Sequence, residues 1–310
     1  MPPFPGSIAK FLASDSAFHR RHGVITAFLA ERAGRPVGRV AAIINRSHNE
    51  YHKDRVGFFG FFECEDNPAT ASALLGKVTE TLLAAGMDAV RGPYNPSIND
   101  DCGILLNRFD QLPIIGLPWN PSYYSKLLED LGFQKARSLY TLNLPLHRLE
   151  PPERFARIVE HMKKRSKLKT RSMNIARLED ELVIVRDVYN ATLERNWGFV
   201  PISMEDLLAA AEDIRAIADP RLLLIGESEG RDAGVAITLP NFNEILAATK
   251  NTPHWLRLLH IFILMKTRKI KTCRQTYRIR KFNTKNRPTK ARVLVPINGT
   301  KKARNTWDFH

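Results

Sequence analysis

Runs of apolar residues divide the first part of the chain into predicted strands and helices. Apolar runs at 24–30 and 37–44, separated by a glycine-containing turn, predict a β-hairpin. An aromatic strand is predicted at 57–63, and Asn67-Pro68 then predicts the start of a helix, with Asn as N-cap and Pro in the first turn. Helical spacing predicts the buried face of that helix: Leu74, Leu75, Val78 and Leu82.

The pattern continues with shorter elements. Short strands are predicted at 88–92 and 114–117, and a second helix is predicted from Asn120-Pro121, which repeats the earlier start signal. The buried face of this helix is predicted to contain Tyr124, Leu127, Leu128 and Leu131. Gly132 would end it, and 133–144 resembles a strand.

A proline-rich segment at 145–152 predicts a domain boundary. Helices are predicted beyond it at 153–169 and 179–195, with a strand at 173–178 between them. Ser203, followed by Asp206, resembles a capping box for a further helix that reaches Ile217.

One motif, E-x-x-G-R-x-x-G, occurs twice, each time between two apolar runs. Its residues are Glu31, Gly34, Arg35 and Gly38 in the first copy and Glu227, Gly230, Arg231 and Gly234 in the second. An Asn-Glu pair follows each hairpin, at 49–50 and at 243–244. Glycine provides the positive φ that a tight reversal needs, so each copy predicts a hairpin. The repeat suggests two copies of one α/β unit.

The basic charge is confined to the end of the chain. Residues 255–310 contain 16 Lys and Arg and one acid, so their net charge of +15 equals that of the whole chain. The last predicted element is a helix at 255–266, whose apolar residues favour a buried helix over an interfacial one. Beyond Lys266 the apolar periodicity is lost. The predicted parts are a first lobe (1–146), a second, incomplete lobe (147–266) and a basic tail open to disorder (267–310).

Bulk composition narrows the class of protein. A chain of 310 residues with 44% apolar content can bury one large core or two ordinary ones. No segment has the length of a membrane span, and the N-terminus lacks the pattern of a signal peptide. Cys64, Cys102 and Cys273 fit neither a disulfide framework nor a zinc site, so a cytoplasmic location is expected.

Polar residues gather in the segment 93–101, after a predicted short strand. Tyr94, Asn95, Asn99 and Asp100 provide a phenol, two amides and a carboxylate. Ligands of open α/β sheets bind beyond the carboxyl ends of strands, so these residues are candidates for substrate binding. An Asx-rich turn explains the same composition, and both interpretations stay open.

Three other patterns have plainer interpretations. His48 and His52 lie four apart around a glutamate, but the order of residues is not that of a zincin helix, and polar contacts in a loop are favoured over a metal site. Ser228 lies in a G-x-S-x-G sequence, which is interpreted as a hairpin turn because a strand rather than a helix follows. The basic run at 163–171 is interpreted as a solvated helix face.

The order hairpin, strand, helix, strand, helix, strand resembles the GNAT superfamily of N-acyltransferases, and more closely a bacterial group with two GNAT-like lobes. The likeness covers roughly residues 17–260. The motifs that carry it include Phe28–Arg32, Gly38–Ala41, Asn49-Glu50, Phe58–Glu63, Gly92-Pro93, Ser97–Asp100 and Trp197–Val200. The resemblance implies an α/β fold of two mixed-sheet lobes flanked by helices. It also implies acetyl-CoA or another acyl-CoA as donor and a small-molecule or peptide amine as acceptor.

The resemblance also implies site residues. A glutamate base at the end of the aromatic strand would be Glu63 or Glu65, although a solvated strand end is the plainer interpretation of both. A tyrosine acid would be Tyr124, one turn before the usual position. The family's glycine-rich pyrophosphate loop is missing, because 63–69 contains three carboxylates and no glycine. Weak or absent activity is therefore expected, with the cofactor-binding residues unassigned.

Two hypotheses of different kinds follow. The first is a GNAT-type N-acyltransferase. The second is a protein that binds nucleic acid or another polyanion through the basic tail, where Tyr277, Phe282 and Trp307 could stack on bases. The first lobe also has too few residues before its hairpin for the usual opening strand and helices. The tail itself has two explanations, a genuine basic segment or an altered reading frame of a longer relative.

Overall fold

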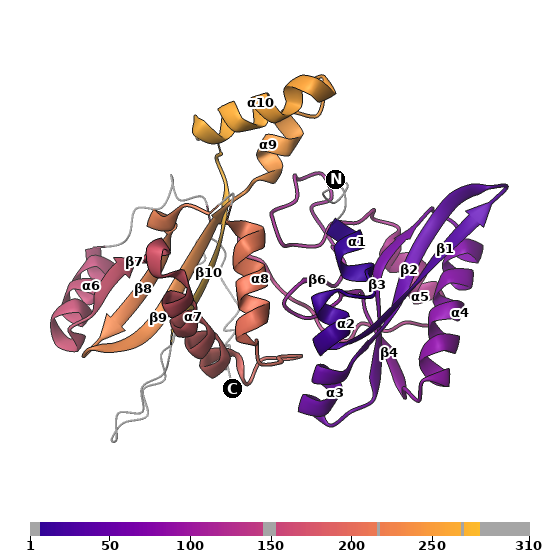
Figure 1. Cartoon of the computed structure of the whole chain (residues 1–310), viewed down its shortest axis with the longest axis horizontal. Coiled ribbons are helices and arrows are strands. Elements are labelled where there is room, and N and C mark those ends of the chain that lie inside the picture. Colours follow the sequence, from indigo (N-terminus) through magenta and orange to yellow (C-terminus); the bar gives the residue numbers. More distant parts are fainter. Residues whose placement is uncertain (1–6, 145–152, 216–217, 268–269, 280–310) are drawn as a thin grey trace, which may run out of the picture. The chain divides into compact units, whose positions relative to one another are not determined.

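In the computed structural model, the described helices and strands lie between Ser7 and Ile279. The described residues are 7–144, 153–215, 218–267 and 270–279. Two four-stranded sheets organise them, with strand orders β1-β2-β3-β4 and β10-β9-β8-β7 (Figure 1). Helices flank both sheets, so the predicted α/β fold class is confirmed. Within the described residues, no helix has the length and apolar character needed to cross a membrane.

The first sheet is mixed. Its strands are β1 (Gly23–Arg32), β2 (Arg35–Asn45), β3 (Val56–Cys64) and β4 (Ala89–Arg91). β1, β2 and β3 pair antiparallel, whereas β4 pairs parallel to β3. This is the order of hairpin, strand, helix and parallel strand that the resemblance implies. The predicted hairpin, aromatic strand and short strand are all confirmed.

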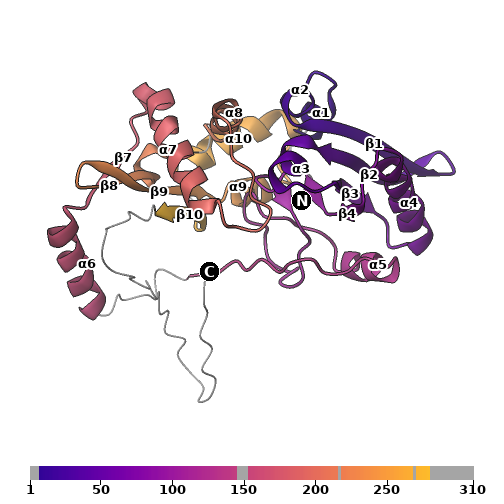
Figure 2. The ribbon, with the colours of Figure 1, turned by 90° about the horizontal axis from the view of Figure 1, so that it is seen from below.

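Helices cover both faces of this sheet. α4 (Pro68–Ala84) packs on β1 and β2, with Asn67 as N-cap and the predicted leucines and Val78 buried. α5 (Tyr124–Asp130) lies on the same side, whereas α1 (Ser7–Leu12) and α2 (Ala17–Arg21) lie on the other (Figure 2). β2 alternates between the two cores, because Val40 and Ala42 face α4 while Ala41 and Ile43 face α1 and α2.

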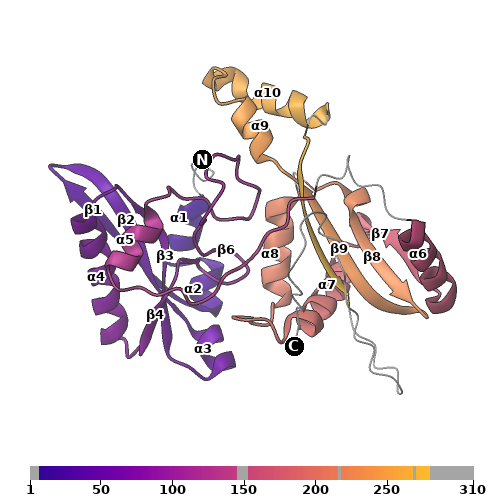
Figure 3. The ribbon, with the colours of Figure 1, turned by 180° about the vertical axis from the view of Figure 1, so that it is seen from behind.

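The second sheet is antiparallel throughout. Its strands are β7 (Lys169–Ser172), β8 (Leu223–Ser228), β9 (Arg231–Pro240) and β10 (Cys273–Ile279). α7 (Leu178–Leu193) and α8 (Met204–Ile214) pack together beside it (Figure 3). Leu182, Val185 and Val188 of α7 form a buried core with Ile225 and Val235 of the sheet. The remaining elements are α3 (Arg46–His52), β5 (Tyr94–Asn95), β6 (Asp101–Cys102), α6 (Glu153–Ser166), η2 (Ile175–Arg177), η3 (Pro220–Leu222), α9 (Asn243–Ala248) and α10 (His254–Lys266).

The two hairpins share their local geometry. The first turns at Ala33-Gly34 and the second at Glu229-Gly230, and all four residues have positive φ. Each hairpin also has a bulge at the same motif position, at Glu31 and at Glu227. A short helix follows each, α3 and α9. The repeated motif therefore has one structure in both places, while the duplication of whole lobes and the three-part domain division stay predictions.

Several predicted elements are wrong. No strand forms at 114–117, where the Ile115 N–H instead donates to Asn241. None forms at 133–144 either, a segment with exposed apolar side chains and no paired strand among the described residues. The strand predicted at 173–178 is displaced to β7, and η2 takes its place. Conversely, β10 lies where loss of pattern was predicted. The boundary at 145–152 falls outside the described residues.

Candidate functional site

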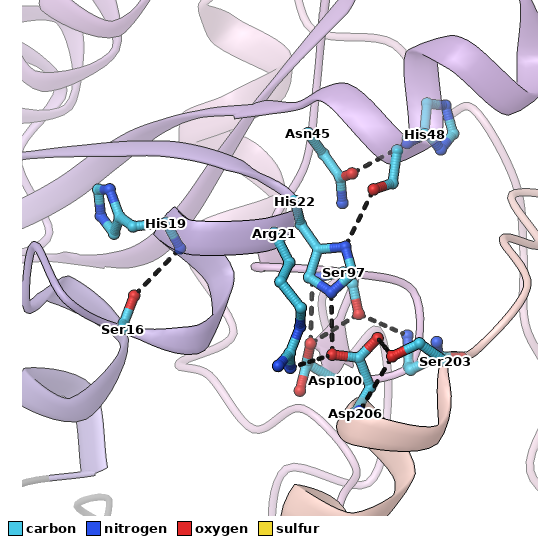
Figure 4. Close-up of polar contacts among 12 residues, drawn as sticks. Ser16, His19, Arg21, His22, Asn45, His48, Ser97, Asp100, Ser203 and Asp206 are labelled. Carbon is cyan, nitrogen blue, oxygen red and sulfur yellow. Dashed lines mark hydrogen bonds and ion pairs between the residues drawn. The ribbon is translucent and has the colours of Figure 1, made fainter.

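Asp206, in the first turn of α8, gathers three polar partners. Its carboxylate accepts hydrogen bonds from Arg21 Nη2 at 2.6 Å, His22 Nε2 at 2.9 Å and Ser203 Oγ at 2.7 Å (Figure 4). Ser203 also accepts the Asp206 N–H, so the predicted helix cap is confirmed and fixes the carboxylate. Burial alone would raise the pKa of Asp206, but these hydrogen bonds outweigh it and hold the pKa well below its usual range.

His22 connects Asp206 to a hydroxyl. It caps the C-terminus of α2, and its backbone carbonyl accepts from the Arg46 N–H at 2.7 Å, which fixes the residue against α3. Its Nδ1 lies 2.9 Å from Ser47 Oγ. In the tautomer that satisfies both neighbours, Nε2 donates to Asp206 and Nδ1 accepts the Ser47 hydroxyl. Ser47, His22 and Asp206 thus form a chain through which a proton can pass from a hydroxyl to an imidazole held by a carboxylate.

A second carboxylate, Asp100, belongs to the same cluster. It accepts from Ser97 Oγ at 2.7 Å and from the Ser97 N–H at 3.2 Å. Burial is the main cause that raises its pKa to about 6; the Ser97 hydrogen bonds oppose the rise, and the negative charges of Asp101 and Asp206 add to it. The charge of Asp206 is paired with Arg21 at 2.6 Å, whereas Asp100 changes charge near neutral pH.

The predicted substrate residues divide into two groups. Tyr94 and Asn95 have packing roles: the Tyr94 ring stacks on Phe58 at 4.6 Å, and the Asn95 side chain accepts the Phe61 N–H at 2.6 Å. The Tyr94 hydroxyl is buried and has no hydrogen-bond partner among the described residues. Asn99 accepts from Tyr189, and Asp100 lies in the cluster described above. Their binding of a substrate stays a prediction.

The predicted base and acid lie elsewhere, at the end of β3. Glu63 is exposed and pairs with Arg39 at 2.7 Å, whereas Glu65 pairs with Arg32 at 2.6 Å. The Tyr124 hydroxyl accepts the Cys64 N–H at 2.9 Å, and burial raises its pKa to about 12. A phenol with that pKa stays protonated at neutral pH. The structure does not bring these three residues together with Asp206, and their catalytic roles stay predictions.

The first lobe does not fit the diphosphate of an acyl-CoA. The Asn67 side chain already accepts the Ala69 and Thr70 N–H groups, at 2.9 and 3.2 Å, which are the donors that a phosphate would need at this helix start. The Thr70 hydroxyl is also occupied, because it donates to Glu65 at 2.7 Å. The pairing of β3 with β4 ends at Phe58 and Arg91. At the end of β3, the Cys64 carbonyl accepts from the Tyr123 hydroxyl and the Cys64 N–H donates to the Tyr124 hydroxyl, so these backbone groups are already paired.

The remaining candidates have structural explanations. His48 and His52 lie on helix α3, not in the predicted loop, because Asn45 caps a helix there. Burial lowers the pKa of His48 to about 4, and His52 bonds the Phe199 carbonyl at 2.8 Å. The described residues contain no group of three or more metal ligands. Ser228 ends β8 and lies in a hairpin, as predicted. The tail residues Phe282 and Trp307 lie outside the described residues, so polyanion binding stays a prediction.

Sequence analysis missed the cluster of Arg21, His22, Ser47 and Asp206 as a site. Asp206 was recognised only as part of a cap, and His22 only ends a short helix. The separation of His22 and Asp206 by 184 positions leaves no local spacing to recognise. The charged first turn of α8 after Ser203 was the single available signal.

The chain is similar in sequence to two known bacterial proteins. No family model matches the chain. The chain is 30% identical over 233 residues to a protein of Caulobacter vibrioides named bacterial ceramide synthase, covering 74% of the chain and 59% of that protein. It is 27% identical over 226 residues to protein YghO of Escherichia coli, covering 73% of the chain and 57% of that protein. The chain therefore spans somewhat more than half the length of these relatives.

Among solved structures, the chain is similar to a crystal structure of FemX. The match covers 84% of the chain and 63% of FemX, with 12% sequence identity and a TM-score of 0.31. A TM-score of this size does not by itself establish a common fold.

Proposed function

We propose that the chain is an N-acyltransferase that moves an acyl group from an acyl thioester to the amine of a long-chain amino alcohol. The observation that carries the proposal is the similarity, over 74% of the chain, to a protein named ceramide synthase. A ceramide is a long-chain amino alcohol whose amine carries a fatty acyl group, so its synthesis by acyl transfer forms one amide bond. The order of elements in the first lobe supports the same reaction class.

The cluster around Asp206 suits the handling of an amine. Asp206 is paired with Arg21, and the ionised form of Asp100 adds a negative charge that favours the approach of an ammonium group. An ammonium nitrogen loses two protons on its way to an amide. The first goes to solvent before the nitrogen attacks the thioester carbonyl; the second leaves the adduct as the C–S bond breaks, and an equivalent proton ends on the departing thiolate. We assign the second proton to Ser47 Oγ, which passes its own proton to His22 Nδ1. The Asp206 carboxylate then stabilises the imidazolium that results.

An acyl-CoA would supply the activated carbonyl. Since the start of α4 does not fit its diphosphate, the described residues of the first lobe are assigned only to the acceptor and its proton. Acetyl-CoA and longer acyl-CoA both remain within the proposal. The name of the relative favours the longer donor.

The test is an acylation assay on the purified full chain. Palmitoyl-CoA or acetyl-CoA is incubated with a long-chain 2-amino-1,3-diol or with ethanolamine, and the N-acyl product and released thiol are measured by mass spectrometry and thiol titration. Amide and thiol are expected in equal amounts, with the long-chain amine preferred. Thiol release without amide, or no product from either donor, would contradict the proposal. Amide from ethanolamine alone would contradict the proposed acceptor.

The variant Ser47→Ala tests whether the reaction takes place at the cluster around Asp206. Removal of a proton-transfer group typically costs about a hundredfold or more in rate, and a loss of that size is expected here. Ser72→Ala is the matched control, because Ser72 is an exposed serine on α4. Equal rates for the two variants would remove Ser47 from the mechanism.

A further inference from the structure

Helix α10 presents large apolar side chains to solvent. The five on one face, with their exposed fractions, are Trp255 (80%), Leu258 (79%), Leu259 (55%), Phe262 (56%) and Ile263 (48%). Their spacing of i, i+3, i+4, i+7 and i+8 puts them on one continuous stripe of the helix. The buried helix favoured from the sequence is therefore wrong.

α10 lies in a connection that is much longer after the second hairpin than after the first, and it is not a part of the sheet. In the first lobe only 53–55 connect the short helix α3 to the third strand, β3. In the second lobe 249–272 connect α9 to β10, which pairs with its hairpin as β3 does, and α10 lies within this connection. α9 is the described element with which α10 makes its main contact. Figure 1 shows α9 and α10 standing clear of β8, β9 and β10.

The charge and composition of this surface fit an anionic lipid bilayer. The stripe ends at Lys266, whose Nζ lies 5.4 Å from the centre of the Phe262 ring, so the ammonium group lies beside the apolar face. Arg268, Lys269 and Lys271 follow in the sequence. Tryptophan is enriched at membrane–water interfaces, and bases near an apolar stripe bind anionic lipid head groups.

We propose that α10 binds the surface of an anionic membrane. The helix lies in the interface with Trp255, Leu258 and Phe262 among the acyl chains and Lys266 at the head groups. This binding goes beyond acyl transfer and does not depend on it. It would place the chain at the surface where a water-insoluble amine is dissolved.

The experiment is co-sedimentation of the full chain with vesicles, without acyl donor or amine, so that its result is independent of the proposed reaction. Vesicles of phosphatidylglycerol with phosphatidylcholine are compared with phosphatidylcholine alone. The variant Leu258→Glu/Phe262→Glu is compared with Leu83→Glu/Leu106→Glu, which changes two exposed leucines of the first lobe. Because all four side chains are exposed, the far-UV circular dichroism of both variants should equal that of the unmodified chain.

Wild type and the first-lobe variant are expected to bind anionic vesicles and to release them in high salt. The α10 variant should bind at least tenfold more weakly. Lys266→Glu leaves the apolar stripe intact and should weaken binding to anionic vesicles roughly tenfold. This variant provides the test if the double variant fails to fold. Equal binding by wild type and these variants would overturn the proposal, as would no binding by wild type. A wild-type dimer that the α10 variant abolishes, without vesicle binding, would assign the face to a second copy instead.

Discussion

Replacing Asp206 by asparagine tests whether the cluster is held together as described. The substitution removes the charge that accepts from Arg21, His22 and Ser203. Hydrogen bonds to charged groups contribute about 1.5–3 kcal/mol when buried, and exposed ion pairs about 0.2–1 kcal/mol. The Arg21 and Asp206 side chains are 31% and 24% exposed, so values near the lower limit apply. Asparagine keeps one acceptor, and a loss of about 2 kcal/mol in unfolding free energy is expected at pH 7.

The loss of unfolding free energy in Asp206→Asn should depend on pH. Because the pKa of Asp206 lies below its usual value of 3.8, its stabilisation is fully present above pH 3.8 and is lost as the pH falls through the lower folded-state pKa. The difference between wild type and Asp206→Asn should therefore not shrink between pH 7 and pH 4, and should shrink below that. Urea denaturation followed by circular dichroism across this range measures it.

Glu80→Gln is the control for this experiment. Glu80 pairs with Lys77 at 2.9 Å on the exposed surface of α4, and its loss should cost less than about 0.5 kcal/mol. If Asp206→Asn costs no more than Glu80→Gln, or if its cost does not change in acid, the cluster is not the ion-paired network that the structure indicates.

Three further predictions concern buried groups. Burial raises the pKa of Asp100 to about 6, so the contribution of this group to stability should fall by up to roughly 3 kcal/mol as the pH rises from 4 to 7; the difference in urea-denaturation free energy between wild type and Asp100→Asn should change by that amount. Burial lowers the pKa of His48 to about 4, so the contribution of this group to stability should fall by up to roughly 3 kcal/mol as the pH falls from 6.5 to 4; the difference between wild type and His48→Gln should change by that amount. Gly198 has φ +70°, and an added Cβ would lie 2.9 Å from the Tyr94 hydroxyl; Gly198→Ala should cost about 1–3 kcal/mol in thermal unfolding. Tyr94→Phe should recover part of that cost, and full additivity of the two changes would contradict the contact.

Elements with local determinants could be predicted from the sequence. The two hairpins were predictable because glycine accepts the positive φ of each turn, at Gly34 and at Gly230. α4 was predictable because Asn67 caps it and its leucines recur at helical spacing. In each case the residues that specify the element lie within it.

Elements defined by distant contacts could not be predicted. β10 contains Arg274, Thr276 and Arg278 alternating with Cys273 and Tyr277, which is the polar pattern of an edge strand and was interpreted as a tail. Its partner β9 precedes it by more than thirty residues. Asn120 has the residue type of a helix cap, yet its side chain accepts the Leu105 N–H at 2.6 Å and α5 begins later.

In the candidate site, too, residues that are adjacent in the sequence were predictable and residues that only folding brings together were not. The polar segment 93–101 was recognised because its residues are adjacent, and Asp100 does lie in the cluster. Arg21, Ser47 and Asp206 come from three helices, and only the folded chain brings them to His22. The family resemblance directed attention to Glu63, Glu65 and Tyr124 instead, at the end of β3. Sequence comparison with a motif cannot reveal a cluster that the motif does not contain.

The most direct test of the central claim is the pH–rate profile of N-acyl product formation by wild type, His22→Gln and the exposed control His161→Gln. If His22 receives the amine proton through Ser47, His22→Gln should form product roughly a hundredfold more slowly than wild type and His161→Gln across the pH range. A His22→Gln variant that forms the N-acyl product as fast as wild type across the pH range would contradict the account.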